Sequence, residues 1–152
     1  MKNGKNCFIH KSAVVEGDAE LGDNCSVWAC AVIRADEGKI KVGNNSNIQD
    51  CCVVHGEATI GENVTVGHGA IVHGCRVGNN VIVGMNASLL TGSEIGDYCI
   101  IAAGAVVKEG QKIPGNSLVA GVPAEVKRQL NEGDRKRVDC ACHAYVDRIK
   151  KK

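Results

Sequence analysis

Three histidines near the middle of the chain have the residue type and the spacing of a metal site. His55 and His73 are 18 residues apart, and His68 lies 13 residues after the first and five before the second. Neutral imidazole is a common ligand of zinc and of other divalent transition metals. Three imidazoles leave one coordination position open, and a water bound there has a pKa of about 7. The three histidines therefore predict hydration or hydrolysis by a metal-bound hydroxide.

A six-residue repeat surrounds these histidines and must position them. Aliphatic residues recur every six positions over residues 9–33 and 42–72, and again over 77–107 after a slip of one residue. Glycine often follows the aliphatic residue, and Asn or Asp tends to come next. A unit this short is typical of a parallel β-helix, in which three units form a triangular coil of about 18 residues. We expect roughly six stacked coils between residues 9 and 119, with Gly or Asn at corners that need positive φ.

The coil length predicts where each histidine lies. Positions 18 residues apart stack in consecutive coils, so His55 and His73 should share a face and reach one ion. His68 lies on the preceding side of its coil and should point from a different face or corner. A homotrimer about an axis parallel to the coils would bring His68 of one subunit to the other two histidines of the next. His10 and His143 have no partners at matching positions, and we expect them to be ordinary surface residues.

Length, composition and charge limit the classes of function. The 152 residues suit one domain, and a net charge of +1 offers no broad field for nucleic acid or a membrane surface. The N-terminus has no apolar leader and no run of about 18 apolar residues occurs, so we expect a cytoplasmic protein. With 44% hydrophobic but only 3% aromatic residues, the core must consist of Val, Ile, Ala and Leu. Most of the nine cysteines occupy apolar repeat positions and should be buried in a reducing cell.

The repeat has one insertion in its first half. Nine residues instead of six separate Ile33 from Val42, in the segment RADEGKIKVG. We expect an exposed loop at a corner, carrying Arg34, Asp36 and Glu37, and such a loop is a reasonable place for function.

The repeat ends near Pro123, where the hydrophobic period changes to 3.6. We therefore expect a β-helix over residues 1–122 and a helical segment over 123–152. The helical segment should pack on the β-helix, over its open end or along its side, with docking on a neighbouring subunit as the alternative. Its apolar face would consist of Val138, Cys142, Tyr145 and Ile149.

The segments RADEG, NIQDCCVVHG, GHGAIVHG and IGMNASLL resemble the gamma-class carbonic anhydrases, and the resemblance extends from about residue 8 to residue 145. It implies an all-β, parallel, left-handed β-helix with a C-terminal α-helix. It also implies homotrimers whose interfaces bind Zn, or Fe or Co under anaerobic conditions, through His55, His68 and His73. The implied reaction is the reversible hydration of CO2 to bicarbonate by a metal-bound hydroxide.

The same resemblance assigns catalytic roles to four residues. Gln49 would orient the hydroxide or CO2, and Asn47 would support that network. Rapid hydration also needs a group that carries the proton to the buffer. Glu37 matches such a shuttle acid, and Tyr145 matches a tyrosine found near the metal in short members of the family.

Three further residues are expected to hold the interface together, and one expected segment is missing. Arg34 would pair with Asp36 or Asp50 across the subunit interface, although ion pairing within the fold explains them equally well. The most active members carry an acidic loop after the first histidine, whereas this chain runs directly from His55 into GEATIG. Glu57 is the only carboxylate there, and we do not assign it the role of the missing loop. We therefore expect slow turnover.

Other functions remain as alternatives. The segment AAGAVVKEGQKIPGNSLVAGVPAEVKR also resembles hexapeptide acyltransferases, and a metal-bound hydroxide would serve a CoA-thioester hydrolase equally well. A metal-containing trimeric scaffold with little activity is the alternative outside enzymes. Cys51 and Cys52, and the CACH segment that includes Cys140, are better explained as structural residues than as metal ligands.

Overall fold

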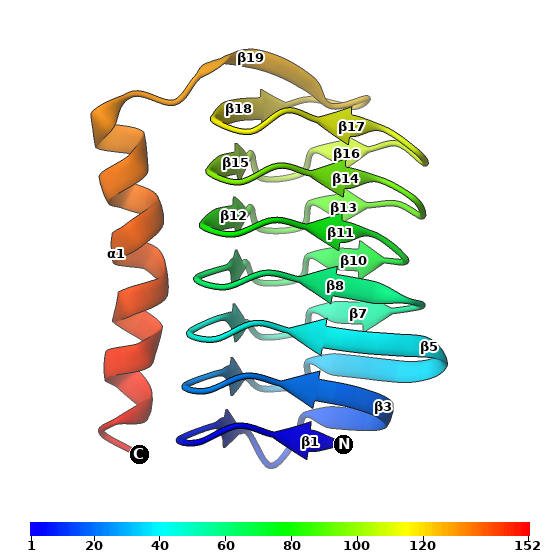
Figure 1. Cartoon of the computed structure of the whole chain (residues 1–152), viewed down its shortest axis with the longest axis vertical. Helices are drawn as coiled ribbons and strands as arrows, with labels where there is room; N and C mark the ends of the chain where they lie inside the picture. The colour runs from blue at the N-terminus through cyan, green and yellow to red at the C-terminus, as the bar shows by residue number, and fades with distance from the viewer.

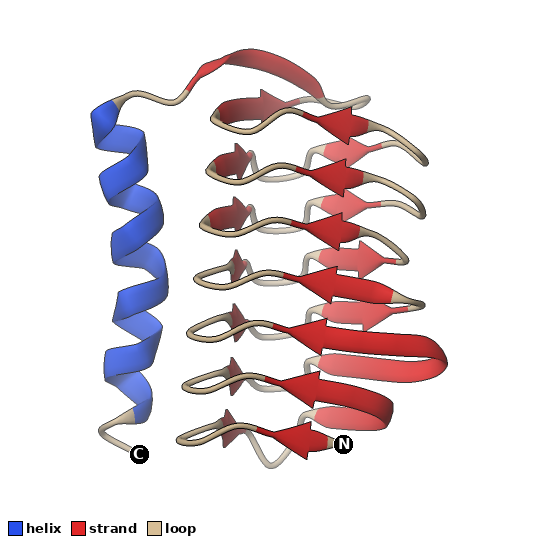
Figure 2. Cartoon of the chain, in the orientation of Figure 1, coloured by secondary structure: helices blue, strands red, loops and turns tan.

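The chain winds upward in stacked triangular coils, and one helix runs back down along their side (Figure 1). This computed structural model describes residues 1–152. In Figure 1 the chain passes leftward in front and rightward behind as it rises, so the coil is left-handed. The expected all-β, parallel, left-handed β-helix with a C-terminal α-helix is confirmed (Figure 2).

The coils present three faces, which we number in the order in which the chain meets them after the first coil. Face 1 holds β7 (Val53–His55), β10 (Ile71–His73), β13 (Ser88–Leu89) and β16 (Val106–Val107). Face 2 holds β1 (Lys2–Asn3), β8 (Ala58–Ile60), β11 (Arg76–Val77), β14 (Glu94–Ile95) and β17 (Lys112–Ile113). Face 3 holds β2 (Phe8–Ile9), β4 (Ser26–Val27), β6 (Asn47–Ile48), β9 (Thr65–Val66), β12 (Val81–Val83), β15 (Cys99–Ile101) and β18 (Ser117–Ala120).

Two longer strands bend around the corner between faces 1 and 2. They are β3 (Val14–Leu21) and β5 (Val32–Val42), and β5 pairs with β7 at its start and with β8 at its end. Their mutual register shifts after Gly17, which pairs with Ala35, because Ala19 pairs with Ile40. The expected three-residue insertion therefore exists, but β5 is an extended strand that continues through the corner and not a separate loop.

The repeated aliphatic residues fill the interior of the coils. One cluster of 32 buried residues forms the core, and its largest members are Ile33, Ile40, Ile48, Ile60, Leu89 and Ile101. Successive side chains of a strand point to opposite faces, so each inward aliphatic residue leaves its two neighbours on the outer surface. This alternation decides which polar side chains are available for chemistry.

The corners contain the residues that positive φ requires. Five asparagines with φ between 55° and 60° stack above one another in consecutive coils. Each side-chain amide hydrogen-bonds the next at 3.0–3.2 Å, along the ladder Asn6, Asn24, Asn45, Asn63 and Asn80. The ladder satisfies the polar groups of the turns and keeps the coils in register.

The cysteines are all free, and most of them are buried. The Cys25 thiol donates to the carbonyl oxygen of Gly43 in the next coil at 3.1 Å. Burial raises the pKa of Cys25 to about 12 and that of Cys52 to about 11, so neither is a nucleophile at neutral pH. Cys30, Cys51 and Cys140 are exposed, contrary to the general expectation of burial.

The C-terminal segment begins with a strand, and the helical prediction from residue 123 is wrong for its first part. Residues Glu125–Gln129 form β19, which pairs antiparallel with β18 and closes the last coil. The free edge of β18 offers backbone partners to this segment, whereas an isolated helix of seven residues would be unstable. The helix α1 extends only over Glu132–Ile149.

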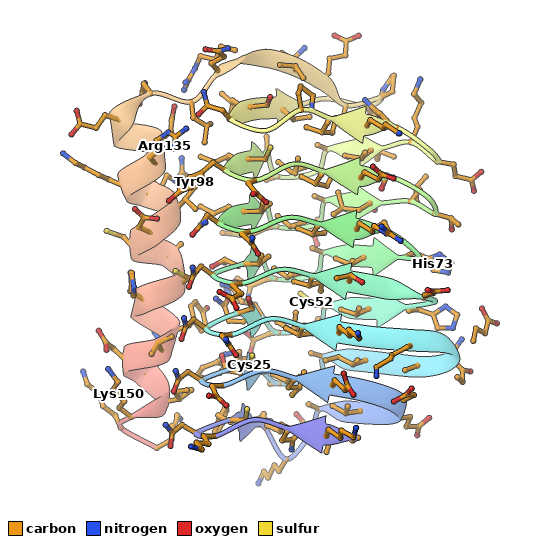
Figure 3. The ribbon with its side chains drawn as sticks, in the orientation of Figure 1. Cys25, Cys52, His73, Tyr98, Arg135 and Lys150 are labelled. Atoms are coloured by element: carbon orange, nitrogen blue, oxygen red, sulfur yellow. The ribbon has the colours of Figure 1, made fainter.

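α1 packs along face 3, against β4, β9 and β12 (Figure 1). Val138 and Cys142 are its buried residues, as the apolar face predicted. Near its first turn, Arg135 lies 4.4 Å from the centre of the Tyr98 ring and donates to Oδ1 of Asn116 (Figure 3). The chain has no helix with the length and hydrophobicity that crossing a bilayer requires.

The start of α1 gives a pH-dependent stability. Asn131 and Asp134 form a capping box, and Arg128 also hydrogen-bonds the Asp134 carboxylate. The Arg128 hydrogen bond and the Asn131 N–H lower the pKa of Asp134 from 3.8 to about 2. A lowered folded-state pKa stabilises the fold above the unfolded value, and this contribution is lost as the pH falls toward 2.

We therefore expect the melting temperature to fall between pH 4 and pH 2 partly through Asp134. Circular dichroism melts should show a shallower fall for Asp134→Asn, which also starts from a lower stability at pH 7. Asp139→Asn, on the same helix, is the matched control for loss of a carboxylate. Identical pH slopes for wild type and Asp134→Asn would contradict the assignment.

Candidate metal centre

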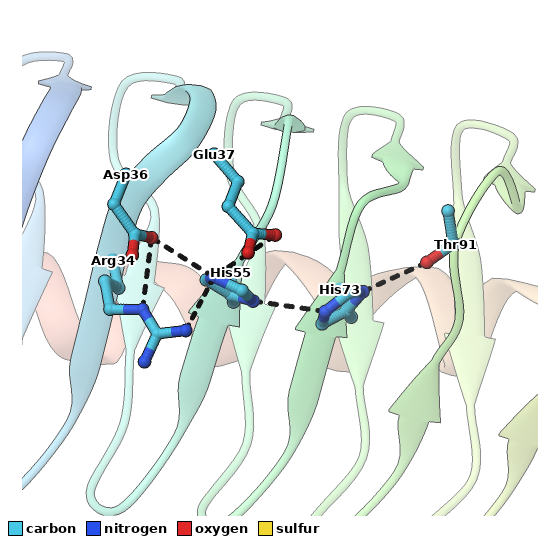
Figure 4. Close-up of polar contacts among 6 residues, drawn as sticks. All are labelled: Arg34, Asp36, Glu37, His55, His73 and Thr91. Carbon is cyan, nitrogen blue, oxygen red and sulfur yellow. Dashed lines mark hydrogen bonds and ion pairs between the residues drawn. The ribbon is translucent and has the colours of Figure 1, made fainter.

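His55 and His73 lie side by side at the ends of β7 and β10. The two residues pair in the parallel register, with Nδ1 of His55 at 3.1 Å from Nε2 of His73 (Figure 4). Val54 and Val72 point into the core with no exposed surface, so the following histidines point outward. The predicted stacking of these two histidines is confirmed.

β5 adds charged side chains to this pair. Arg34 pairs with His55 in the strand register, and its Nη2 lies 2.9 Å from Nε2 of that histidine. Arg34 also donates from Nε to Oδ1 of Asp36 at 3.1 Å, and this oxygen lies 3.2 Å from His55 Nε2. Oε2 of Glu37 is 3.7 Å from the same nitrogen. The expected Arg34–Asp36 pair thus forms within one chain, on the inserted corner.

The hydrogen bonds of this cluster run in one direction. A guanidinium can only donate, so Nε2 of His55 accepts from Arg34 in the neutral ring. Nδ1–H of His55 then donates to Nε2 of His73. Nδ1–H of His73 in turn donates to Oγ1 of Thr91 at 3.0 Å (Figure 4). Thr91 lies 18 residues after His73, so the coil period that stacked the histidines also identifies this partner.

His68 lies apart from the other two histidines. It follows β9 in the corner between faces 3 and 1, and its Nδ1 lies 2.8 Å from Oδ2 of Asp50. Its side chain is 47% exposed. No three His, Cys, Asp or Glu side chains of the chain converge on a common point. Face 1 therefore carries His68 at the edge where β10 begins and the His55–His73 pair at the edge where its strands end.

Gln49 and Asn47 form a buried network on face 3. Nε2 of Gln49 donates to Oδ1 of Asn47 at 3.1 Å. Nδ2 of Asn47 faces two acceptors, Oγ1 of Thr65 at 3.0 Å and the Val64 carbonyl at 3.5 Å. Because the Val64 carbonyl can only accept, the Asn47 amide has one orientation. The network leaves Oε1 of Gln49, next to the Asp50 corner, free to accept another hydrogen bond.

Tyr145 belongs to the same side of the molecule as Gln49. Its ring lies 5.3 Å from the Trp28 ring, and the Arg148 guanidinium lies 4.8 Å from its centre. Burial raises the pKa of Tyr145, and the negative charge of Asp50 acts in the same direction. Within one chain, Tyr145 is therefore near the His68 corner and packs on an aromatic neighbour.

A groove of about 570 Å³ opens beside His73 toward face 2. Its walls include Glu37, Glu57, Arg76 and Thr91. Glu57 is there because the spacing between stacked residues falls from 18 at the histidines to 17 at Thr59 and Arg76, which makes Glu57 the extra residue. The sequence showed this slip of one residue, but not that the extra carboxylate lines a groove beside a histidine.

The arrangement of the imidazoles fits a divalent metal ion. A separation of 3.1 Å between His55 Nδ1 and His73 Nε2 is close to that of two ligands with bonds of about 2.1 Å. Metal-binding histidines usually donate from their second nitrogen to an acceptor. Thr91 accepts from His73, Asp50 is placed to accept from His68, and Asp36 would accept from Nε2 of His55 once Nδ1 binds an ion. The Arg34 and Asp36 contacts to that Nε2 therefore belong to different tautomers.

The coils and the corner ladder define a hexapeptide-repeat protein. The family model described as bacterial transferase hexapeptide (six repeats) matches residues 4–35 and 74–109. A hexapeptide transferase family protein from Anaplasma phagocytophilum superimposes with a TM-score of 0.96 at 34% identity, over 99% of this chain and 91% of that one. N-acyltransferase structures from Bacillus cereus at 18–19% identity share the fold alone.

Sequence relatives define the family more closely. A probable carbonic anhydrase of Methanocaldococcus jannaschii is 55% identical over 93% of this chain and 92% of its own length. The mitochondrial gamma carbonic anhydrase 2 of Arabidopsis thaliana is 37% identical over 94% of this chain, which spans 55% of that protein. The carnitine operon protein CaiE of Escherichia coli is 38% identical over 84% of this chain and 67% of that protein. The chain belongs to the gamma-class carbonic anhydrase family of hexapeptide-repeat proteins.

Proposed function

We propose that this protein is a metal-dependent carbonic anhydrase, which converts CO2 and water reversibly into bicarbonate and a proton. The observation that carries the proposal is the pair of converging imidazoles of His55 and His73, with His68 at the opposite edge of the same face. The 55% identity to a probable carbonic anhydrase over nearly the whole chain supports it.

We propose further that face 1 is the interface of a homotrimer. An outward column of aliphatic residues runs along this face through paired positions of β3, β5, β7 and β10: Val14, Val32, Val53 and Ile71. Val14 is 43% and Ile71 39% exposed in the single chain, and large exposed apolar residues in a row indicate a contact surface. Threefold packing through this face would bring His68 of one subunit to the His55–His73 pair of its neighbour.

The metal-holding residues would be His55, His73 and the neighbour's His68, with Zn as the expected ion and Fe or Co as alternatives. A divalent ion with three imidazole ligands lowers the pKa of a bound water to about 7 and so supplies hydroxide at neutral pH. Asp50, 2.8 Å from Nδ1 of His68, would hold that ring with Nε2 toward the ion.

The surrounding side chains would orient the reactants and remove the proton. Oε1 of Gln49 can only accept a hydrogen bond, so it would orient a hydroxyl group through its hydrogen, with Asn47 fixing the amide. Glu37 is exposed, 3.7 Å from His55, and lines the groove that opens to solvent. A carboxylate in this place can pass the proton to the buffer.

Stopped-flow measurement of CO2 hydration tests the proposal. The protein should be purified anaerobically with its metal quantified, because Fe is easily lost or oxidised. We expect a rate that exceeds the buffer rate in proportion to bound metal and disappears when a chelator removes it. Full metal loading with no rate above that of the buffer would overturn the proposal, leaving a CoA-thioester hydrolase or a metal-containing scaffold.

A further inference from the structure

We infer that Thr91 is a positioning residue, which holds the His73 ring in the tautomer that binds a metal through Nε2. The inference deepens the proposed function and rests on its metal site. It assigns a role to a residue that binds neither the metal nor CO2.

The first support is the contact itself. Oγ1 of Thr91 lies 3.0 Å from Nδ1 of His73, on the side of the ring opposite to His55 (Figure 4). A hydroxyl oxygen at this distance accepts a hydrogen bond from Nδ1–H, and the neutral ring then has its lone pair on Nε2. Nε2 is the nitrogen that faces Nδ1 of His55 at 3.1 Å.

The second support is the rigidity of the Thr91 backbone. The carbonyl oxygen of Thr91 accepts from the Gly110 N–H at 3.0 Å, and the adjacent Gly92 N–H donates to Gly74 at 2.8 Å. A Cβ added at Gly74 would lie 3.3 Å from Cγ2 and Oγ1 of Thr91, so the side chain packs closely over that glycine. The coils above and below thus fix the hydroxyl relative to His73.

The third support is the contrast with His55. In the metal-free chain, Arg34 donates to Nε2 of His55, so the proton of that ring is on Nδ1, the nitrogen that faces His73. His55 must therefore change tautomer and exchange Arg34 for Asp36 before Nδ1 can bind an ion. His73 needs no such change, because Thr91 already holds its proton on the far nitrogen. We infer that His73 is the preorganised ligand of the pair.

Loss of the Thr91 hydroxyl should weaken metal binding without removing a ligand. Replacing an outer partner of a metal-binding histidine typically costs about 10- to 100-fold in metal affinity. Thr91→Val keeps the shape of the side chain and removes the acceptor, whereas Thr91→Ser keeps the acceptor. Thr59→Val is the matched control, because Thr59 lines the same groove without contacting a histidine.

Two measurements test the inference on the intact protein. Long-range ¹H–¹⁵N spectra of the metal-free protein report the tautomer of each histidine, and competition with a chromophoric chelator reports the Zn²⁺ dissociation constant. For Thr91→Val we expect a smaller Nδ1–H population at His73 and a dissociation constant raised about 10-fold or more. Thr91→Ser and Thr59→Val should match the wild type in both.

The outcomes separate this inference from the proposed function. A Thr91→Val protein with the wild-type tautomer and wild-type Zn²⁺ affinity would overturn the role of Thr91 and leave the carbonic anhydrase proposal intact. Equal weakening by Thr91→Ser would also overturn it, since any change at the site would then suffice. A wild-type protein that binds no Zn²⁺, Fe²⁺ or Co²⁺ would overturn both proposals.

Discussion

Replacing His55 by alanine is expected to remove nearly all bound metal and to lower kcat/KM for CO2 hydration by at least about 1,000-fold. Without the ion, the pKa of water returns from about 7 toward 15.7, and hydroxide becomes scarce at neutral pH. His73→Ala should behave alike, since the two imidazoles converge at 3.1 Å on one proposed ion. Metal analysis and stopped-flow rates on the same preparations check the prediction.

His10→Ala is the matched control for these variants. Its imidazole lies on β-helix surface of the first coil and hydrogen-bonds Ser12 at 2.8 Å, away from the metal centre. Both His55→Ala and His73→Ala should keep the fold, because the side chains point outward from a core that they do not fill. A His55→Ala protein with wild-type metal content and rate would show that the pair is not the site.

The sequence alone was sufficient to predict the His55–His73 pair. A coil of 18 residues in parallel register places every residue above the one 18 positions earlier, so spacing translates directly into contact. The same rule placed the aliphatic residues in the core and asparagine at the corners. It also predicted that His68 could not join the pair within one chain, and the structure confirms this separation.

Other features depended on contacts that periodicity does not describe. The segment that forms β19 has no strand repeat, and it is extended because the last coil leaves the edge of β18 unpaired. The bend of β5 through its corner depends on pairing with β3 along its whole length. Both outcomes result from tertiary pairing that overrides the local pattern.

The candidate site shows the same division. Residue types and family resemblance identified the ligands and Gln49, but not the direction of the hydrogen bonds around them. That direction follows from Arg34, which can only donate, and from the Val64 carbonyl, which can only accept. Thr91 lay within reach of the 18-residue rule, but a threonine in a turn carries no signal of its own. Its role emerged only from its distance to His73.

The sharing of each site between two subunits predicts that two inactive variants restore each other. His55→Ala lacks the paired half of the site, and His68→Ala lacks the other half. In trimers reassembled at random from equal amounts, half of the interfaces receive an intact pair, and half of those receive an intact His68 from the neighbour. About one quarter of the sites should then be complete. A mixture of His55→Ala with His73→Ala is the control, because both variants lack the same half.

Metal content and CO2 hydration of these mixed trimers test the central claim most directly. We predict about a quarter of the wild-type metal and rate for His55→Ala mixed with His68→Ala, and none for the control mixture or for either variant alone. No recovery in mixed trimers whose subunit exchange is verified by mass spectrometry would contradict a site shared between subunits.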